Sequence, residues 1–132
     1  MAEGTGRAGE PRGHGFAGYV GPIDLTGDVF SFTVEPRHLN GGDRLHGGMM
    51  MSFASLVLGA VADRAAEGGQ ASPLSINCDF VSAGEPGDRV EASGEITRKT
   101  RTVLFVAATL KARGKVMMTA TGVYKVVAEA RA

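Results

Sequence analysis

The feature that most constrains this chain is a 14-residue run, Met49–Ala62, that contains no charged side chain. A membrane-spanning helix needs about 20 such residues, so the run is too short to cross a bilayer. Its apolar residues leave no polar face, which predicts a helix that is buried on every side. Asp63 and Arg64 mark its return to water, and Gly68-Gly69 are expected to stop it.

Alternating apolar residues predict one strand before this helix and four strands after it. The expected strands are residues 28–34, 74–80, 90–96, 102–110 and 116–127. Short links between the later strands favour an antiparallel meander. The fold class is therefore α+β, with an antiparallel sheet of about five strands wrapped around one long buried helix. Because such a sheet covers only one side of a helix, a partner chain is expected to cover the other.

Length and composition indicate a single domain and argue against a nucleic-acid partner. The chain has 132 residues, and its 14 Lys plus Arg balance its 14 Asp plus Glu. The zero net charge argues against a nucleic-acid binder. Residues 1–15 are Gly-rich and poor in apolar side chains, so a disordered tail is expected before a domain over 16–132. No apolar leader or membrane segment is visible, and the cytoplasm is the expected location.

Cysteine and histidine offer no obvious metal or redox chemistry. Cys78 is the only cysteine, so no internal disulfide can form, and its apolar surroundings predict a small core residue. His14, His38 and His46 have no ligand-like spacing with Cys78 or with a cluster of carboxylates. We therefore expect no metal site and no resident cofactor.

The stretch that carries chemistry is the turn from Asn40 to Gly48, which leads into the apolar helix. The first N–H groups of a helix lack intrahelical partners and lie at its positive end. At His46-Gly47-Gly48 the two glycines leave room for a carbonyl oxygen to approach these groups as it becomes an oxyanion. Asn40 and His46 could orient a water or a carbonyl. The alternative is that the glycines only satisfy the geometry of the turn and that His46 caps the helix.

This turn and the apolar helix resemble the hotdog-fold acyl-CoA thioesterases of the phenylacetate-pathway type. The shared pattern is Asn40, five residues, His46-Gly47-Gly48 and then the apolar helix. The resemblance implies a hotdog fold, in which the Gly47 N–H polarises a thioester carbonyl while Asn40 and His46 position the carbonyl or the attacking water. It also implies a substrate whose acyl or aryl group is carried on coenzyme A or on acyl carrier protein. The site would lie between two chains of a homodimer, which is expected to pair into a dimer of dimers.

One position departs from the family pattern. Relatives carry Asp or Glu nine residues after the His, where this chain has Ser55. A carboxylate there acts as general base or nucleophile, and a serine hydroxyl can do so only beside a base. Ser55 lies about 12 Å along the helix from Gly47, so one thioester could reach both only if they came from different chains. Three alternatives remain open: a thioesterase with rerouted chemistry, a non-hydrolytic acyl-CoA binder, or an enzyme whose Asp was replaced by engineering.

Further residues are candidates for holding the substrate. They are Gly48, Met49 and Ser52 at the start of the helix, Ser75 (with Ser72) in the strand after it, and Arg98, Lys99 and Thr100 in a basic link that suits coenzyme A phosphates. The alternative for this link is a solvated hairpin, and the alternative for Met49 is core packing. A hotdog dehydratase would place an acid or base on the same helix, and a purely structural module would leave the Gly-rich turn unexplained.

Overall fold

A computed structural model of the chain describes residues 15–127. The helices are α1 (Gly15–Val20) and α2 (Gly47–Ala65), and η1 (Pro36–His38) is a short 3-10 turn; the strands are β1 (Phe30–Thr33), β2 (Ala71–Phe80), β3 (Arg89–Lys99), β4 (Val103–Ala112) and β5 (Lys115–Val126). Most of the expected tail and the last five residues of the expected domain lie outside this range. Gly15, which we assigned to the tail, is the first residue of α1.

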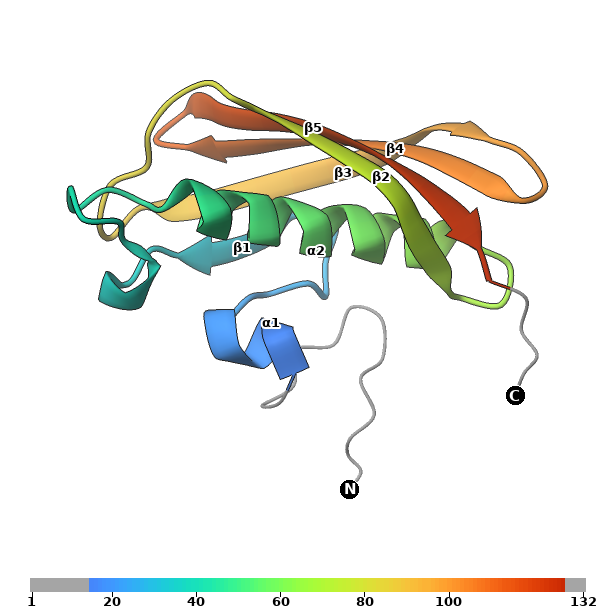
Figure 1. The fold of residues 1–132 in the computed structure, drawn as a ribbon, viewed down its shortest axis with the longest axis horizontal. Coiled ribbons are helices and arrows are strands. Elements are labelled where there is room, and N and C mark those ends of the chain that lie inside the picture. The colour runs from blue at the N-terminus through green and yellow to red at the C-terminus, as the bar shows by residue number, and fades with distance from the viewer. Residues whose placement is uncertain (1–14, 128–132) are drawn as a thin grey trace.

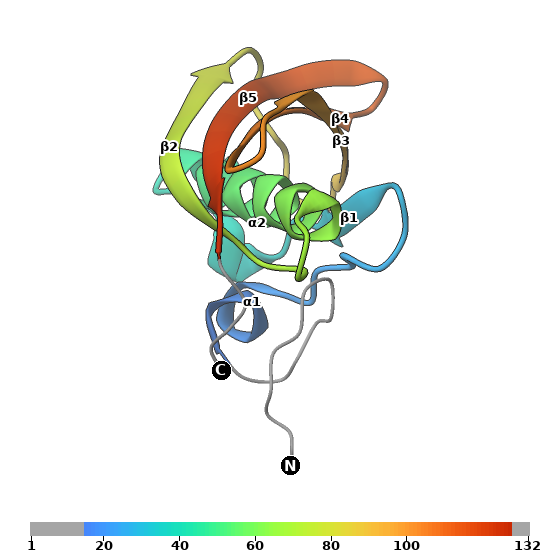
Figure 2. The same cartoon turned by 90° about the vertical axis from the view of Figure 1, so that its right-hand side faces the viewer.

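The five strands form one antiparallel sheet that curls around α2 (Figures 1 and 2). This is the α+β arrangement expected from the sequence. Strand β4 lies at the centre, and its even-numbered residues face α2, where Leu104, Val106 and Leu110 are 0–1 % exposed. The helix packs tightly against the sheet, since a Cβ added to Gly94 would lie 2.9 Å from Val61 Cγ2. Burial of these apolar faces is the main force that holds the two layers together.

The strand order differs from a simple meander. Strands β3, β4 and β5 follow one another as expected, but β2 pairs with β5 at the far edge of the sheet, which gives the order β1-β3-β4-β5-β2. The link over residues 81–88 therefore crosses the sheet from the edge strand β2 to β3, which is next to the opposite edge strand β1. Eight extended residues span up to about 26 Å, which is enough for this crossing. Cys78 consequently lies in an edge strand and is only partly buried, rather than being a core residue.

The crossing link is fastened by an ion pair between Asp88 and Arg113. Arg113 Nε lies 2.9 Å from Asp88 Oδ1, and the Glu85 N–H donates to Asp88 Oδ2 at 2.8 Å. The Asp88 side chain is 8 % exposed. Burial alone would raise the pKa of this carboxyl, but the hydrogen bonds from Arg113 and Glu85 lower the pKa below its usual value. Ionised Asp88 thus holds together the link and the turn between β4 and β5.

Replacing Asp88 with Asn is expected to lower the Tm at pH 7 by about 2–5 °C. A carboxyl whose pKa is lowered on folding adds stability above its unfolded pKa of about 3.9, and this stability is lost as the pH falls through the folded pKa. The Tm difference between the parent and Asp88→Asn should therefore narrow below about pH 4. Thermal melts from pH 3 to 7 test this, and a difference that stays constant over the range would contradict it.

Within a single chain the sheet buries one side of α2, as expected for a sheet that can cover only one side of a helix. The helix begins at Gly47 rather than at Met49, and its sheet-facing side includes Phe53, Val57 and Leu58 at 0 % exposure. The side turned away from the sheet is only partly covered (Figure 2). The residues that share this open side are Gly48, Ser52, Ser55, Leu56, Gly59 and Asp63. Most of these residues are small, so the open side of α2 is a row of short side chains. The apolar composition of the run did not predict this row.

Candidate active site

The turn before α2 is held in shape by Asn40. Its Oδ1 accepts hydrogen bonds from the N–H groups of Gly42 at 2.8 Å and Arg44 at 3.1 Å. Asp43 adopts a positive φ of 61°, and its N–H donates to Asn40 O. Because the Asn40 oxygen is engaged twice within the turn, its exposed amide NH2 is the part that can still act on a ligand. Asp43 is therefore a turn residue.

His46 is the N-cap of α2. Its Nδ1 accepts from the Gly48 N–H at 2.7 Å, so in this arrangement the proton of the neutral ring is on Nε2. The N–H groups of Met49 and Met50 both donate to His46 O. His46 therefore caps the helix, as the alternative interpretation held, and still presents an Nε2–H donor on an exposed ring. Since Nδ1 is already an acceptor for Gly48, His46 is not free to act as a general base through that atom.

The N–H of Gly47 is the free donor at this helix start. Among residues 15–127 no acceptor bonds to it, whereas the N–H groups of Gly48, Met49 and Met50 are all engaged. Gly48, a predicted substrate-binding residue, therefore offers no free N–H. Phe80 lies beside Gly47, since a Cβ added there would be 3.2 Å from Phe80 Cε1. This aromatic neighbour could not be foreseen from the sequence, because Phe80 is at the end of β2, 33 residues after Gly47.

Ser55 has no activating base among residues 15–127 of its own chain. Its hydroxyl donates to Ser52 O at 2.8 Å, and the Ser52 hydroxyl donates to Gly48 O at 2.8 Å. Both side chains are thus satisfied within the helix while keeping lone pairs that can accept. His46 is nine residues away at the start of α2, which places it about 13 Å along the axis. A serine nucleophile is consequently not assembled in a single protomer.

The carboxylates near α2 have structural roles. Asp63 lies two turns beyond Ser55, and its Oδ1 accepts from the Ala71 N–H at 2.8 Å, which fixes the start of β2. Burial raises the pKa of Asp63, while this hydrogen bond opposes the change. Burial, together with Asp63, also raises the pKa of Tyr124 to about 12, so that phenol stays protonated. Asp79 alternates with the helix-facing Phe80 and therefore points to the other side of the sheet.

Two β-bulges move predicted substrate contacts away from the turn. A bulge between Pro73 and Ser75 shifts the alternation of β2, so that Ser75 pairs with Val123 on the sheet face turned away from α2. Ser72, opposite Lys125, lies on that same outer face. The structure therefore does not bring Ser75 or Ser72 to the helix start. One extra residue in a strand reverses which face each later side chain occupies, and the sequence did not reveal it.

The basic link lies at the opposite end of α2. A bulge between Ile96 and Arg98 places Arg98 opposite Phe105 on the outer face and turns Lys99 toward the helix, where its Nζ donates to Ala65 O at 2.9 Å. Thr100 closes the turn between β3 and β4 through Val103. Eighteen residues separate Ala65 from Gly47, which is about 27 Å along the helix. Within one chain the link therefore cannot contact a thioester held at Gly47.

A pocket of about 300 Å³ adjoins the start of α2. Its walls come from α1, from the segment around η1, and from the exposed edge of the first turns of α2. They include Phe16, Tyr19, Leu39, His46, Met49 and Ser52. The pocket thus brings His46, Met49 and Ser52 together, three of the residues that the sequence singled out. The contribution of α1 was not foreseen.

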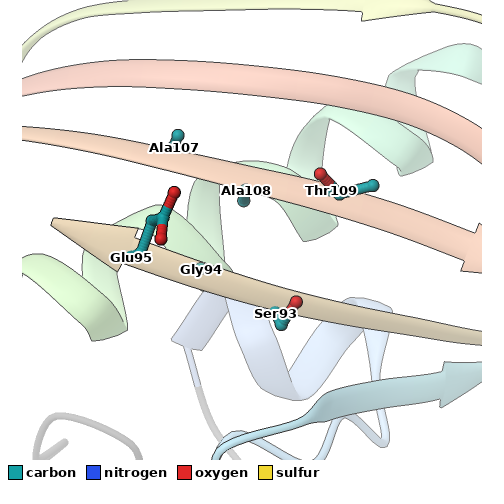
Figure 3. Close-up of a pocket in the computed structure, with 6 residues that line it drawn as sticks. All are labelled: Ser93, Gly94, Glu95, Ala107, Ala108 and Thr109. Atoms are coloured by element: carbon teal, nitrogen blue, oxygen red, sulfur yellow. The ribbon is translucent and has the colours of Figure 1, made fainter. Parts of the chain in front are cut away.

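A second hollow, of about 220 Å³, lies between β3 and β4 (Figure 3). It is lined by Ser93, Gly94, Glu95, Ala107, Ala108 and Thr109. The small side chains of Ala107 and Ala108 leave the space, and Glu95 is its only titratable group. It shares no residue with the Asn40–Gly48 turn, so it contributes nothing to the site at the helix start.

Comparison with known protein families identifies the family to which the chain belongs. The sequence model of the acyl-CoA thioesterase N-terminal domain matches residues 34–125, which is more than two thirds of the chain. The match includes the Asn40–Gly48 turn, α2, β2 to β4 and all but the last residue of β5. The chain belongs to this thioesterase family. Comparison with curated protein sequences gives no match. Among residues 15–127, no helix is both long enough and apolar enough to cross a membrane.

Solved structures confirm the hotdog fold of this thioesterase-family chain. The Escherichia coli PaaI protein, from the phenylacetic acid degradation operon, is 20 % identical with a TM-score of 0.71, over 76 % of this chain and 72 % of that one. A Streptococcus mutans protein bound to acetyl-CoA is 20 % identical with a TM-score of 0.72, over 78 % and 82 %. A hypothetical thioesterase from Streptococcus pneumoniae with coenzyme A is 21 % identical with a TM-score of 0.69, over 75 % and 79 %.

Proposed function

We propose that this protein hydrolyses an acyl-CoA or aryl-CoA thioester, with the carbonyl oxygen held by the N–H of Gly47. The observation that carries the proposal is the free Gly47 N–H at the start of α2, in a chain of the acyl-CoA thioesterase family. The positive end of the helix favours the charge that develops on the carbonyl oxygen when water attacks. Gly47 has no side chain that would hinder the approach of the thioester.

The neighbouring polar groups of the turn act as donors. Asn40 offers its NH2 group and His46 offers Nε2–H, because their acceptor atoms are engaged by backbone N–H groups of the turn. Such donors can orient the thioester carbonyl or the attacking water, but they cannot remove a proton from that water. The base must therefore come from elsewhere, and Ser55 occupies the position at which the family pattern has a carboxylate.

We further propose that the site is shared between two protomers. Gly47 and Ser55 are about 12 Å apart along one helix, so only a second chain can bring an equivalent pair to one thioester. The open side of α2 suits this contact, because Gly48, Ser52, Ser55 and Gly59 would let a second helix approach closely. The outer edge of β2 is also without a strand partner among the described residues.

Apolar side chains near these two surfaces support the same proposal. Met51, Leu74, Phe80 and Val81 are 46–61 % exposed in the single chain. They lie on α2, on β2 and just after it, where a second protomer would cover them. In an antiparallel pair, the basic link of one chain, Arg98 to Thr100, could approach the turn of the other and bind coenzyme A phosphates. Pairing of such dimers into a tetramer remains a prediction.

The alternative function is acyl-CoA binding without hydrolysis. It is favoured by the hydroxyl of Ser55, which donates to Ser52 O and has no base beside it in the part of the chain that the structure describes. Such a protein would keep the oxyanion donors, the pocket at the start of α2 and the two-chain arrangement. It would lack only the group that activates water.

Hydrolysis and binding assays separate the two functions. Short, medium and aryl acyl-CoAs are incubated with the protein, released thiol is measured, and affinity for the same compounds is determined by calorimetry. We expect slow thiol release that saturates with substrate. Binding without release supports the alternative, and no binding of any acyl-CoA contradicts both. Light scattering across a concentration series tests the dimer, and a chain that stays monomeric while hydrolysing substrate would exclude the shared site.

A further inference from the structure

We propose that α1 is the specificity element of this site. Its aromatic side chains, Phe16 and Tyr19, form the outer wall of an acyl pocket that admits a short chain or a single ring. This inference rests on the proposed function, because it assumes that the thioester carbonyl lies at Gly47. It goes beyond that function by naming which segment limits the acyl group and how large that group can be.

The pocket is continuous with the helix start that holds the carbonyl. His46, which directly precedes Gly47, lines it, as do Met49, which directly follows Gly48, and Ser52, one turn further along α2. An acyl group attached to a carbonyl at Gly47 therefore has this pocket as a neighbouring apolar space. Met49 lies at its floor, with 7 % of its surface exposed. A thioether side chain of this kind adapts its shape to an apolar ligand.

The volume sets the size limit. A cavity of about 150 Å³ is enough to bind benzene. The volume of about 300 Å³ here leaves room for one ring with a few further atoms, or for a chain of about six carbons. A chain of twelve carbons would have to displace α1 or extend past it into water. The pocket therefore predicts a marked fall in affinity between medium and long acyl chains.

The wall is held in place by His38. This side chain is 4 % exposed, its Nδ1 accepts from the Glu35 N–H at 2.9 Å, and its Nε2–H donates to Val20 O at 2.7 Å. Its ring also packs edge-on against Phe32, with centroids 5.3 Å apart. His38 thus ties the last residue of α1 to the core of the domain. The position of α1 is therefore determined by the fold and does not depend on the short helix alone.

The aromatic rings of α1 are exposed without a ligand. Phe16 is 55 % exposed and Tyr19 is 82 % exposed, although both border the apolar pocket. Arg37, also at the pocket, is paired with Glu35 and is therefore not a free cation for a charged acyl group. An uncharged acyl group would cover part of both rings, which would remove apolar surface from water.

Calorimetry on the full chain tests this proposal. The Kd values of free coenzyme A, acetyl-CoA, hexanoyl-CoA, benzoyl-CoA and dodecanoyl-CoA are compared for the parent, Phe16→Ala and Tyr19→Ala. We expect the parent to bind hexanoyl-CoA and benzoyl-CoA more tightly than free coenzyme A. Each alanine variant should lose about tenfold in affinity for these two compounds, with free coenzyme A unchanged. Val29→Ala is the matched control, because Val29 is 52 % exposed and lies outside the pocket.

Phe16→Trp tests the opposite change, because it adds side-chain volume to the pocket wall. Phe16 is 55 % exposed, so the larger side chain is not expected to disturb folding. It should weaken dodecanoyl-CoA binding further and leave acetyl-CoA unchanged. Equal affinities for acyl-CoA and free coenzyme A in the parent, or alanine variants that match Val29→Ala, would overturn the proposal. If no thiol is released but Phe16→Ala still weakens the binding of hexanoyl-CoA and benzoyl-CoA, the proposed hydrolysis is refuted and the proposed acyl pocket stands. Thiol release that is insensitive to all α1 variants would refute the pocket alone, and no binding of any compound would overturn both.

Discussion

Replacing Gly47 with proline is expected to lower kcat/KM for thioester hydrolysis by about 10²–10³, because proline deletes the N–H that no acceptor among residues 15–127 engages at the helix start. The substitution should leave the helix intact. Gly47 is the first residue of α2, where proline is well accepted since no intrahelical bond is lost. The preceding residue, His46, has φ −65° and ψ 134°, which is the extended conformation that a residue before proline prefers.

The matched control is Gly47→Ala. Alanine adds the same Cβ, 3.2 Å from Phe80 Cε1, but keeps the N–H. Thiol release by the parent and both variants is compared, with acyl-CoA affinity and Tm measured on the same samples. We expect Gly47→Ala to retain most of the activity and Gly47→Pro to lose it at nearly unchanged affinity. Equal losses in the two variants would mean that crowding by Phe80 is responsible and that the N–H does not act on the carbonyl.

Replacing Ser55 with aspartate is expected to raise kcat/KM by about 10²–10⁴, which is the contribution of a positioned general base. The hydroxyl of Ser55 donates to Ser52 O, and among residues 15–127 no base is bonded to it, so this position supplies no group that can take a proton from water. The position is on the open side of α2, so a carboxylate there would not enter the hydrophobic core of its own chain.

Ser55→Asn is the control for shape, since asparagine has the size of aspartate without its basic oxygen. Only the aspartate variant should gain activity, and the gain should disappear as the pH falls below the pKa of the new carboxyl. A gain with both substitutions would point to altered packing. If aspartate leaves thiol release unchanged while acyl-CoA still binds, the protein is better described as a binding protein.

Mixed dimers test whether one site uses two chains. One chain carries Gly47→Pro with Ser55→Asp, and the other carries Ser55→Ala with Gly47 intact. Each homodimer lacks either the donor or the base, so both should be inactive. A shared site predicts that mixing the chains restores hydrolysis, because the second chain's turn then faces the first chain's aspartate. Mixtures that stay inactive, although the chains exchange, would place the whole site within one protomer.

Local features of the sequence determined the class of fold and the centre of the site. The apolar run of α2 and the alternation of the later strands depend on which side of each element is buried, and both patterns can be counted along the chain. The Asn40–Gly48 turn could be recognised because glycines and a capping histidine before an apolar helix have local consequences. Ser55 stood out through the resemblance to the family, whose pattern has Asp or Glu nine residues after the His.

Only the tertiary structure decided which of these groups remain free and which lie together. The choice between Gly47 and Gly48 depended on a hydrogen bond from the Gly48 N–H to His46, and the place of α1 depended on a bond between His38 and Val20, eighteen residues apart. Ser75 lies away from the site because the bulge after Pro73 places it on the sheet face turned away from α2. Composition and periodicity describe how each segment is buried, but bulges, strand order and hydrogen bonds between distant residues are fixed when the segments pack against one another.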